Sequence, residues 1–581
     1  MFRKNDQHLQ WPLFSSIDSL PEKQQARLEA SWAGTFYHEL FCRINEEPFA
    51  VLYSDDEASR PNIPVNLLVG FETLKAGFGW SDEEAFDHFC FDVQVRYAVG
   101  HRDLSEGHFD LRTVYNFRYR VAKHMQESGE NLIDQAFEQV TDEQVAAFNL
   151  KTNKLRMDST LIASNIRQTT RLQLLVEVLQ RVHRMLDEGE QQQYRDDFAA
   201  YLKGSSGQYI YSIKKEAYAA HLQRVGELMH QLVVELQAKY ADEPAYQVLE
   251  RVFKEHFAIG EGALRAKEGE ELSADSLQSP DDWEATYRRK RGQDYIGYVT
   301  NVTETCHPEN PFQLVVQVQT ESNNTDDAVM LAEALPSLKE RTGVNEMHTD
   351  GGYNSPSVDE TMQEHQVQQI QTAIRGRKPS KEKLGLEDFE WQTHADDGQP
   401  QSVTCPHGQQ AAITTGRKEG RYRAAFDSSG CESCPLREQC PTEPLKRRPE
   451  NVLRFSQQDI NVALRRQRCT DARASQQHLR PAVEATVRAV KHPFGNGKVP
   501  VRGKPRVSML MIGSAAMNNV RQIYRYQISQ EETDRAEKGS QKAAESPRRQ
   551  PVSSFFASFW AQLRVCLRLV HPLRPAWAYS F

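Results

Sequence analysis

The sequence contains no apolar run long enough for a clear transmembrane helix, and its first residues lack the apolar core of a signal peptide. It has nine cysteines, an odd number with four of them clustered, which argues against the disulfide framework of a secreted protein. A cytosolic protein without membrane association is therefore expected. At 581 residues, the chain is too long for one compact domain and predicts three or four.

An overall positive charge is also lacking, since the net charge is −9, and this alone argues against nucleic-acid binding. The charge is distributed unevenly, however. Residues 461–526 contain thirteen Lys or Arg and only two acids, Asp471 and Glu484. A basic stripe of this kind can bind a phosphate backbone, and a solvated basic face has the same composition. Charge alone leaves both interpretations open.

The first 150 residues predict a helical domain. Residues 61–78 place Val, Leu and Phe at helical spacing, and Ser81 followed by three acids is a typical helix start. A further helix is expected from Asp110, with three arginines, Arg118 among them, beside two tyrosines. Short helices that end in a basic and aromatic one can form a DNA-binding domain, with Arg118 as a candidate contact. Helical bundles without a DNA role have the same pattern.

A mixed α/β layout follows this domain. Residues 154–163 predict a strand that ends near Asp158, and later apolar stretches predict three more strands, at 295–300, 312–320 and 344–350, and a last one at 367–374. Helices are expected from 326 to 341 and from about 357. Asp350 would come just after the fourth strand, where two glycines predict a tight turn. The two aspartates would then belong to separate strands.

Two long segments interrupt this layout. Residues 165–275 predict a helical insertion, in which one apolar seam could pack against residues 171–186 or serve self-association (Leu222, Val225, Met229, Leu232 and Leu236). Residues 375–455 are basic and polar, so a loop-rich insertion with little core is expected there. Residues 527–581 are expected to form a linker and a tail, with an amphipathic stretch at 555–570.

Four cysteines of the second insertion have spacing suited to a metal site. Cys431 and Cys434 form a Cys-x2-Cys pair, and Cys405 and Cys440 flank it. Four thiolates favour tetrahedral Zn²⁺, and a segment with little core gains stability from a metal. The spacing predicts a possible structural Zn²⁺ site, and four reduced cysteines without a metal are the alternative.

A third acid lies in a helix-like stretch between two cations. Arg480, Glu484 and Lys491 are separated by four and then seven positions, which returns them to nearly the same helical face. If Asp158, Asp350 and Glu484 converge, they can hold two Mg²⁺ or Mn²⁺ ions, because these hard cations favour oxygen ligands. Two such ions can activate a nucleophile and stabilise a leaving oxygen at phosphorus.

The chain resembles bacterial insertion-sequence transposases of the DDE type over most of residues 40–526. Four motifs carry the resemblance: Arg-Met-Asp158-Ser-Thr, the polar turn from Thr320 to Asp327, His-Thr-Asp350-Gly-Gly-Tyr, and Arg480-x3-Glu484-x6-Lys491. Many relatives carry a Tyr three residues before the Arg, where this chain has Gln477. That departure puts the phosphate contact of the tyrosine in doubt and leaves the assignment of the glutamate unaffected.

This resemblance implies an α/β ribonuclease-H-like catalytic core over residues 151–526, with the helical and cysteine-containing insertions inside it. Residues 1–150 would be the helical DNA-binding domain. The implied function is metal-dependent cleavage and strand transfer at terminal inverted repeats. The implied partners are double-stranded DNA, as transposon ends and target, and a second copy of the chain, at the nucleoid of a bacterial cytoplasm.

The resemblance also implies two groups of site residues. The three acids named above would bind two Mg²⁺ or Mn²⁺ ions, and the DNA near the cleaved end would be held by Arg480, Lys491 and Arg488. A nuclease of the same fold without strand transfer and an inactive DNA-binding regulator are the alternative functions. The complete set of acids argues against the regulator, and only strand-transfer products distinguish the other two.

Overall fold

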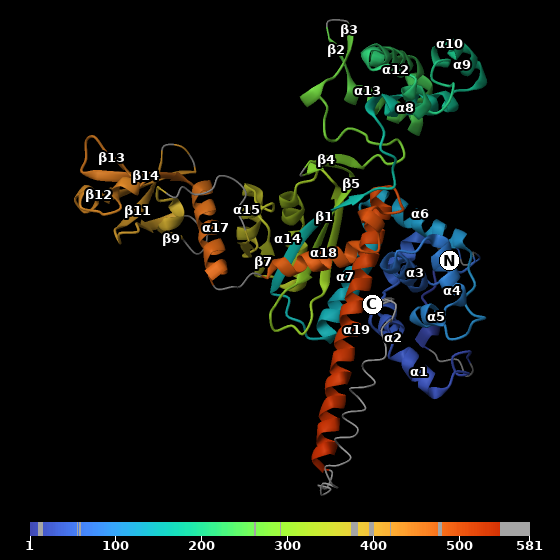
Figure 1. The fold of residues 1–581 in the computed structure, drawn as a ribbon, viewed down its shortest axis with the longest axis horizontal. Helices are drawn as coiled ribbons and strands as arrows, with labels where there is room; N and C mark the ends of the chain where they lie inside the picture. The colour runs from blue at the N-terminus through green and yellow to red at the C-terminus, as the bar shows by residue number, and fades with distance from the viewer. Residues whose placement is uncertain are drawn as a thin grey trace, which may run out of the picture.

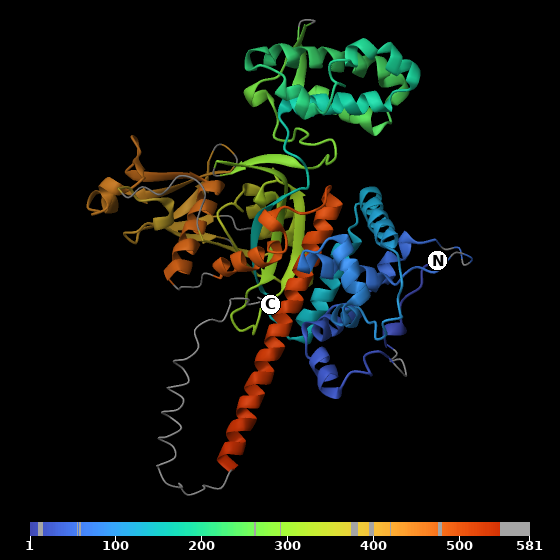
Figure 2. The same cartoon turned by 45° about the vertical axis from the view of Figure 1, so that its right-hand side comes forward.

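The computed structural model describes residues 1–9, 15–54, 56, 58, 60–260, 263–290, 292–372, 382–393, 400–416, 418, 420–474 and 479–545. Four parts are visible in Figures 1 and 2: a bundle of amino-terminal helices, a central sheet, a helical lobe at one end of that sheet, and a second sheet to one side. Within the described ranges, no helix is both long enough and apolar enough to cross a membrane.

The amino-terminal bundle packs against the carboxy-terminal helix α19 (Lys504–Glu545). The bundle consists of α1 (Glu22–Glu29), α2 (Trp32–Glu39), α3 (Val65–Phe78), α4 (Asp82–Phe91), α5 (Val93–Ala98), α6 (Leu111–Ser128) and α7 (Leu132–Ala147). α4 begins at the expected signal, where Ser81 and Glu84 form a capping box. α3 and α19 approach closely because Gly513 has no side chain: a Cβ there would lie 2.9 Å from the Ala76 Cβ.

The central sheet is mixed. Its strands are β1 (Lys154–Ala163), β4 (Thr286–Lys290), β5 (Gln293–Thr305), β6 (Val315–Ser322), β7 (Glu346–Thr349) and β8 (Gln368–Gln371). They follow the order β4-β5-β1-β7-β8, and β6 also pairs with β5. β1 is antiparallel to β5 and parallel to β7. Helices flank the sheet (Figure 1), namely α14 (Asp327–Thr342), α15 (Pro356–Glu364), α18 (Val483–Lys491) and α19. This arrangement is consistent with a ribonuclease-H-like core.

Helix α19 belongs to the core rather than to a tail. The side-chain amide of Asn519 donates to the carbonyl of Val315 and accepts from its N–H, both at 2.8 Å, which satisfies the backbone at the start of β6. The predicted linker after residue 526 is wrong as far as Glu545, because the helix continues to that residue. Residues 529–545 are rich in the helix formers Gln, Glu, Lys and Ala. The stretch 555–570 lies outside the described residues.

One strand prediction is wrong, and one strand was not predicted. β1 does not end near Asp158, because its second half stays paired with β5 as far as Ala163. The sequence also failed to predict β4, which contains three cations and forms through a hairpin that pairs Lys290 with Gln293. Asp350 directly follows its strand as predicted, and the strand, β7, is the fifth of this sheet along the chain rather than the fourth.

Between β1 and β4, the chain leaves the sheet and forms the helical lobe (Figure 2). The lobe contains α8 (Arg171–Met185), α9 (Glu188–Gln193), α10 (Arg195–Phe198), α11 (Ser206–Tyr211), α12 (Tyr218–Tyr240), α13 (Pro244–His256) and the hairpin of β2 (Phe257–Gly260) and β3 (Ala263–Ala266). The five seam residues of α12 are buried with α8 in a core separate from that of the central sheet. The seam is therefore used inside the chain and is not exposed for self-association.

The prediction of a loop-rich cysteine insertion is wrong, because this segment forms an antiparallel sheet. Its strands are β9 (Glu390–Thr393), β10 (Pro400–Thr404), β11 (Gln410–Thr415), β12 (Arg421–Asp427), β13 (Glu443–Pro444) and β14 (Glu450–Ser456). Apolar side chains alternate with polar ones, so one face is buried although the composition is polar. Phe389, Phe426 and Phe455 fill the core of this face. Helices α16 (Ser428–Glu432) and α17 (Gln457–Ala474) complete the unit.

Candidate active site

Three elements bring the three predicted acids together. Asp158 lies in the middle of β1, and Asp350 directly follows β7, the parallel neighbour of β1. Glu484 is in the first turn of α18, which packs against β1. Because the two strands run parallel side by side, residues at and beyond the end of β7 lie close to the middle of β1. The acids are far apart in the sequence and meet only through this pairing.

The guanidinium of Arg480 contacts all three carboxylates. Its Nη2 atom lies 3.0 Å from Oδ1 of Asp158 and 4.0 Å from Oδ2 of Asp350. Its Nη1 atom lies 2.9 Å from Oε1 of Glu484. Arg480 begins the short 3-10 helix η8 (Arg480–Ala482), which leads directly into α18. A residue that the sequence assigned to DNA thus holds the acids together in this structure.

The three acids differ in how deeply they are buried, and this difference determines the electrostatics of the site. The side chain of Asp158 is 13% exposed, that of Asp350 39% and that of Glu484 56%, so the site opens towards solvent at the helix. Burial raises the pKa of Asp158, and the attraction of Arg480 partly offsets this effect. Burial lowers the pKa of Arg480, but its attraction and hydrogen bonding to Asp158 outweigh the burial and raise that pKa overall.

The chemistry of these donors fits a divalent cation. Carboxylate oxygens are the ligands that Mg²⁺ and Mn²⁺ prefer, and here they surround a cationic group supplied by the protein itself. In the part of the chain that the structure describes, no group of three or more His, Cys, Asp or Glu side chains is arranged as a ready-made metal site. The three acids are the residues that could hold the ion if it took the place of the guanidinium.

A buried ion pair ties α18 to β1. The Arg156 Nε atom donates to Oε1 of Glu304 on β5 at 2.7 Å, and the other oxygen of Glu304 accepts from the Thr486 hydroxyl at 2.7 Å. Arg156 also donates to the carbonyl of Leu479 at 2.9 Å. Glu304 is 2% exposed. This contact was not predicted from the sequence. A sign of it there is the glutamate that lies within the apolar stretch forming β5.

Lys491 and Arg488, the other two candidates for DNA contact near this site, differ in their surroundings. The Lys491 Nζ atom donates to the carbonyl of Leu161 at 2.7 Å and lies 3.4 Å from the hydroxyl of Thr160, so it reaches the far half of β1. Burial lowers the pKa of Lys491. Its side chain runs over Gly497, where a Cβ would come within 2.0 Å of the Lys491 Cε. Arg488 is exposed on α18.

Arg118, the remaining candidate for DNA contact, is placed inside the amino-terminal bundle. Its side chain is 11% exposed, and its Nη2 atom lies 2.6 Å from oxygens of both Glu72 and Asp82. This network holds α6 against α3 and the start of α4, and it pairs the guanidinium of Arg118 with two acids. The exposed face of α6 instead carries Arg112, Tyr115, Asn116, Tyr119 and Arg120.

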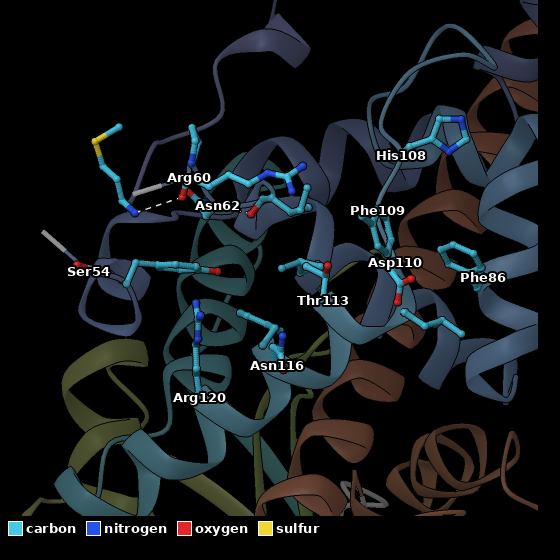
Figure 3. A pocket seen from close by; sticks show the side chains of 17 residues that line it. Ser54, Arg60, Asn62, Phe86, His108, Phe109, Asp110, Thr113, Asn116 and Arg120 are labelled. Carbon is cyan, nitrogen blue, oxygen red and sulfur yellow. Dashed lines mark hydrogen bonds between the residues drawn. The ribbon is translucent and has the colours of Figure 1, made fainter. Parts of the chain in front are cut away.

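One side of α6 also lines a pocket of about 830 Å³ (Figure 3). Thr113, Asn116 and Arg120 reach it from the helix, and Arg60 and Asn62 lie across from them (Figure 3). None of the three acids lines this pocket. It therefore belongs to the amino-terminal bundle and is separate from the carboxylate site.

The four cysteines of the second sheet are free thiols that do not form a ready-made metal site. Cys405, Cys431 and Cys440 pack against the same apolar core. Burial raises the pKa of Cys431, and the thiols of Cys440 and Cys405 act in the same direction. The N–H of Gln409 donates to the Cys405 Sγ atom at 3.3 Å. Cys434 lies one turn after Cys431, whose carbonyl accepts from its N–H at 3.4 Å.

Comparison with known protein families found a match to the carboxy-terminal part of the chain. Residues 404–524 match the family model described as a transposase DDE domain. The matched range contains Glu484 and the five cysteines from Cys405 to Cys469, whereas Asp158 and Asp350 precede it. Gln477 also falls within it but lies outside the described residues. Neither the curated proteins nor the solved structures contain a match. The match to the transposase DDE domain supports a DDE-type transposase.

Proposed function

We propose that this protein is the transposase of an insertion sequence, which binds terminal inverted repeats, cleaves DNA at their ends and transfers the strands to a target. The observation that supports this function is the convergence of Asp158, Asp350 and Glu484 on one guanidinium. The single positive charge of Arg480 cannot balance three carboxylates that lie close together, so a purely structural role would not favour this grouping.

Mg²⁺ or Mn²⁺ would be held by the three acids. When bound, two such ions activate the nucleophilic oxygen and stabilise the leaving oxygen at phosphorus. The chain holds the ligands for this chemistry: β1 fixes Asp158, and the N–H of Gly352 donates to Oδ1 of Asp350 at 2.7 Å. Glu484 stands at the open side, where DNA can approach. If the carboxylates held an ion, Arg480 would be free to contact a phosphate.

DNA would be held by two surfaces. Arg480, Lys491 and Arg488 would contact phosphates near the scissile bond, which positions the strand without reading its sequence. The exposed basic and aromatic face of α6 would recognise the terminal repeats within the domain of residues 1–150. Two transposon ends joined in one complex would require two copies of the chain, one at each end.

A plasmid assay tests this function. The substrate carries the inverted repeats that flank the gene, and the purified protein is added with Mg²⁺ or Mn²⁺. We expect cleavage at the repeat ends and joined target products, and we expect both to be lost with Asp158→Asn and with Asp350→Asn. Asp326→Asn is the matched control because it makes the same charge change at an exposed helix cap, where Asn caps equally well.

The two alternatives predict other products. Cleaved ends without joined products would identify a nuclease of the same fold. Repeat binding without cleavage would identify a regulator. Either result would overturn the transposase function.

We also propose a structural Zn²⁺ site formed by Cys405, Cys431, Cys434 and Cys440. Two observations support this site: three of the cysteines pack against one apolar core, and an N–H donates to the Cys405 sulfur, which stabilises a thiolate. Metal analysis of protein purified without chelator should find zinc, and Cys434→Ser should lose it and unfold at a lower temperature. Wild-type protein that contains no zinc would contradict the site.

A further inference from the structure

A fourth acid, Asp327, lies beside the carboxylate site and has no part in the chemistry described so far. It is the first residue of α14. Its side chain is 9% exposed, and its Oδ1 atom makes no hydrogen bond to any described part of the chain. A buried carboxylate oxygen without a partner is costly and calls for an explanation.

Asp327 faces Asp350 across the backbone of Gly352. A Cβ on Gly352 would come 2.9 Å from Oδ1 of Asp350 and 3.3 Å from Oδ2 of Asp327, so both oxygens border the same methyl-sized space. Ser159, the neighbour of Asp158 on β1, interacts with the Asp327 carboxylate. Asp327 is therefore close to Asp350 at Gly352, and it is linked to Asp158 through the neighbouring Ser159.

A role at the helix terminus does not account for this placement. An acid in the first turn of a helix is favoured by the helix dipole, but this effect does not require burial. The neighbouring Asp326 already caps α14, because its exposed side chain accepts from the N–H of Ala328 at 3.0 Å. Burial raises the pKa of this second acid, and the attraction of Arg288 and Lys290 on β4 offsets the effect only in part, while the nearby Asp350 raises that pKa further. Part of the cost of burying this charge therefore remains for a cation to compensate.

We propose that Asp327 is a fourth acidic residue of the centre, where it strengthens the binding of a divalent cation between Asp158 and Asp350. This inference rests on the proposed function, because the cation belongs to that function. Asp327 is a positioning residue in this account, since it acts through the ion and its ligands and does not contact the DNA.

Mn²⁺ binding to the full-length protein without DNA tests the inference. We expect Asp327→Asn to weaken Mn²⁺ binding by about tenfold, as is typical when a partner of a metal ligand is removed. Asp326→Asn is the control and should bind Mn²⁺ like the wild type. Without metal, Asp327→Asn should unfold at the same or a higher temperature, because it keeps the shape of the side chain and removes a buried charge beside Asp350.

If Asp327 only stabilised the start of α14, its replacement by Asn would lower the unfolding temperature and leave Mn²⁺ binding unchanged. That result would overturn the inference. Asp327→Glu retains the charge and should recover most of the affinity lost in Asp327→Asn. If Asp327→Asn does not fold, Asp327→Ser measures the same loss with a smaller side chain, and unchanged Mn²⁺ binding there would again overturn the inference.

The outcomes for the two proposals are distinguishable. Unchanged Mn²⁺ binding in Asp327→Asn would overturn the role of this residue, while DNA cleavage and joining by the wild type would still support the proposed function. Wild-type Mn²⁺ binding that does not depend on Asp158 would overturn both.

Discussion

At the scale of single residues, the site is governed by the balance between carboxylates and cations. Arg480 neutralises acids that would otherwise repel one another, and its pair with Asp158 is largely shielded from solvent. Its pair with Glu484 is different, because the carboxylate is 56% exposed and such pairs contribute no more than about 1 kcal/mol. Asp158 is thus the anchored end of the site, and Glu484 is the end that can adjust to DNA or to an ion.

Glu484→Gln should separate DNA binding from catalysis. The substitution removes a negative charge near Arg480 and Lys491, so binding to repeat DNA should be retained or strengthened. The loss of a metal ligand should abolish cleavage, while the exposure of Glu484 predicts little change in the unfolding temperature. Gel-shift, cleavage and thermal-unfolding measurements on one preparation check all three. Normal cleavage in Mg²⁺ by this variant would refute the catalytic assignment of Glu484.

Lys491→Ala is the companion variant, with the opposite balance of effects. It should weaken cleavage, because a phosphate contact near the scissile bond is lost, and leave recognition of the terminal repeats by the amino-terminal domain largely intact.

At the scale of elements, the site depends on how α18 is held against β1. The two elements meet through Glu304, which bonds Arg156 on one side and Thr486 on the other. All three side chains are buried. Because a buried charge that loses a partner is costly, this contact favours one position of the helix over all others. The position of Glu484, two residues before Thr486, follows from it.

Thr486→Val should therefore impair catalysis from a distance. Val has nearly the shape of Thr but leaves an oxygen of Glu304 unpaired, which should cost about 1–3 kcal/mol of stability. A small shift of α18 should lower the cleavage rate by roughly tenfold to 100-fold, because misplacing catalytic groups by about 1 Å has effects of this size. DNA binding should change little. Thr486→Ser retains the hydroxyl and should restore cleavage; failure of that rescue would argue against the positioning role.

At the scale of the whole molecule, peripheral units with cores of their own are attached to the central sheet. The helical lobe begins and ends at one point, where Asp282 accepts from the hydroxyls of Ser164 and Tyr298 and, at 3.0 Å, from the N–H of Gly503. Its apolar core is separate from that of the sheet. The lobe therefore depends on the sheet for its attachment rather than for its packing.

Excision of the lobe should leave the rest of the protein folded. Replacement of residues 169–278 by a short Gly- and Ser-rich linker retains Ser164 and Asp282, so the closing contact is preserved. We expect a cooperative unfolding transition at nearly the wild-type temperature, measured by circular dichroism. Asp282→Asn in the full-length chain is the comparison and should lower that temperature, because it weakens three hydrogen bonds at once, two of them buried. An excised protein without a cooperative transition would show that the sheet needs the lobe.

Local signals explain what the sequence predicted well. The capping box at Ser81, the glycine turn after Asp350 and the apolar seam of α12 each act over a few residues, and the structure contains each of them. The three acids could be proposed for the same reason, since each lies in a short motif with its own chemistry. The basic and polar composition of residues 375–455 led to the wrong prediction of a loop-rich segment. Apolar and polar side chains alternate along its strands, so one face is buried although the average composition is polar.

Tertiary structure alone decided which charges meet. Nothing near Arg118 in the sequence indicates its pairing with Glu72 and Asp82, and nothing near Asp327 indicates that it faces Asp350. β4 forms only because β5 is there to pair with it. The sequence by itself determined the type of chemistry and the local elements, because those depend on neighbouring residues. The assignment of each charge to metal, to DNA or to the interior depends on contacts between residues tens to hundreds of positions apart, and only the folded chain brings these together.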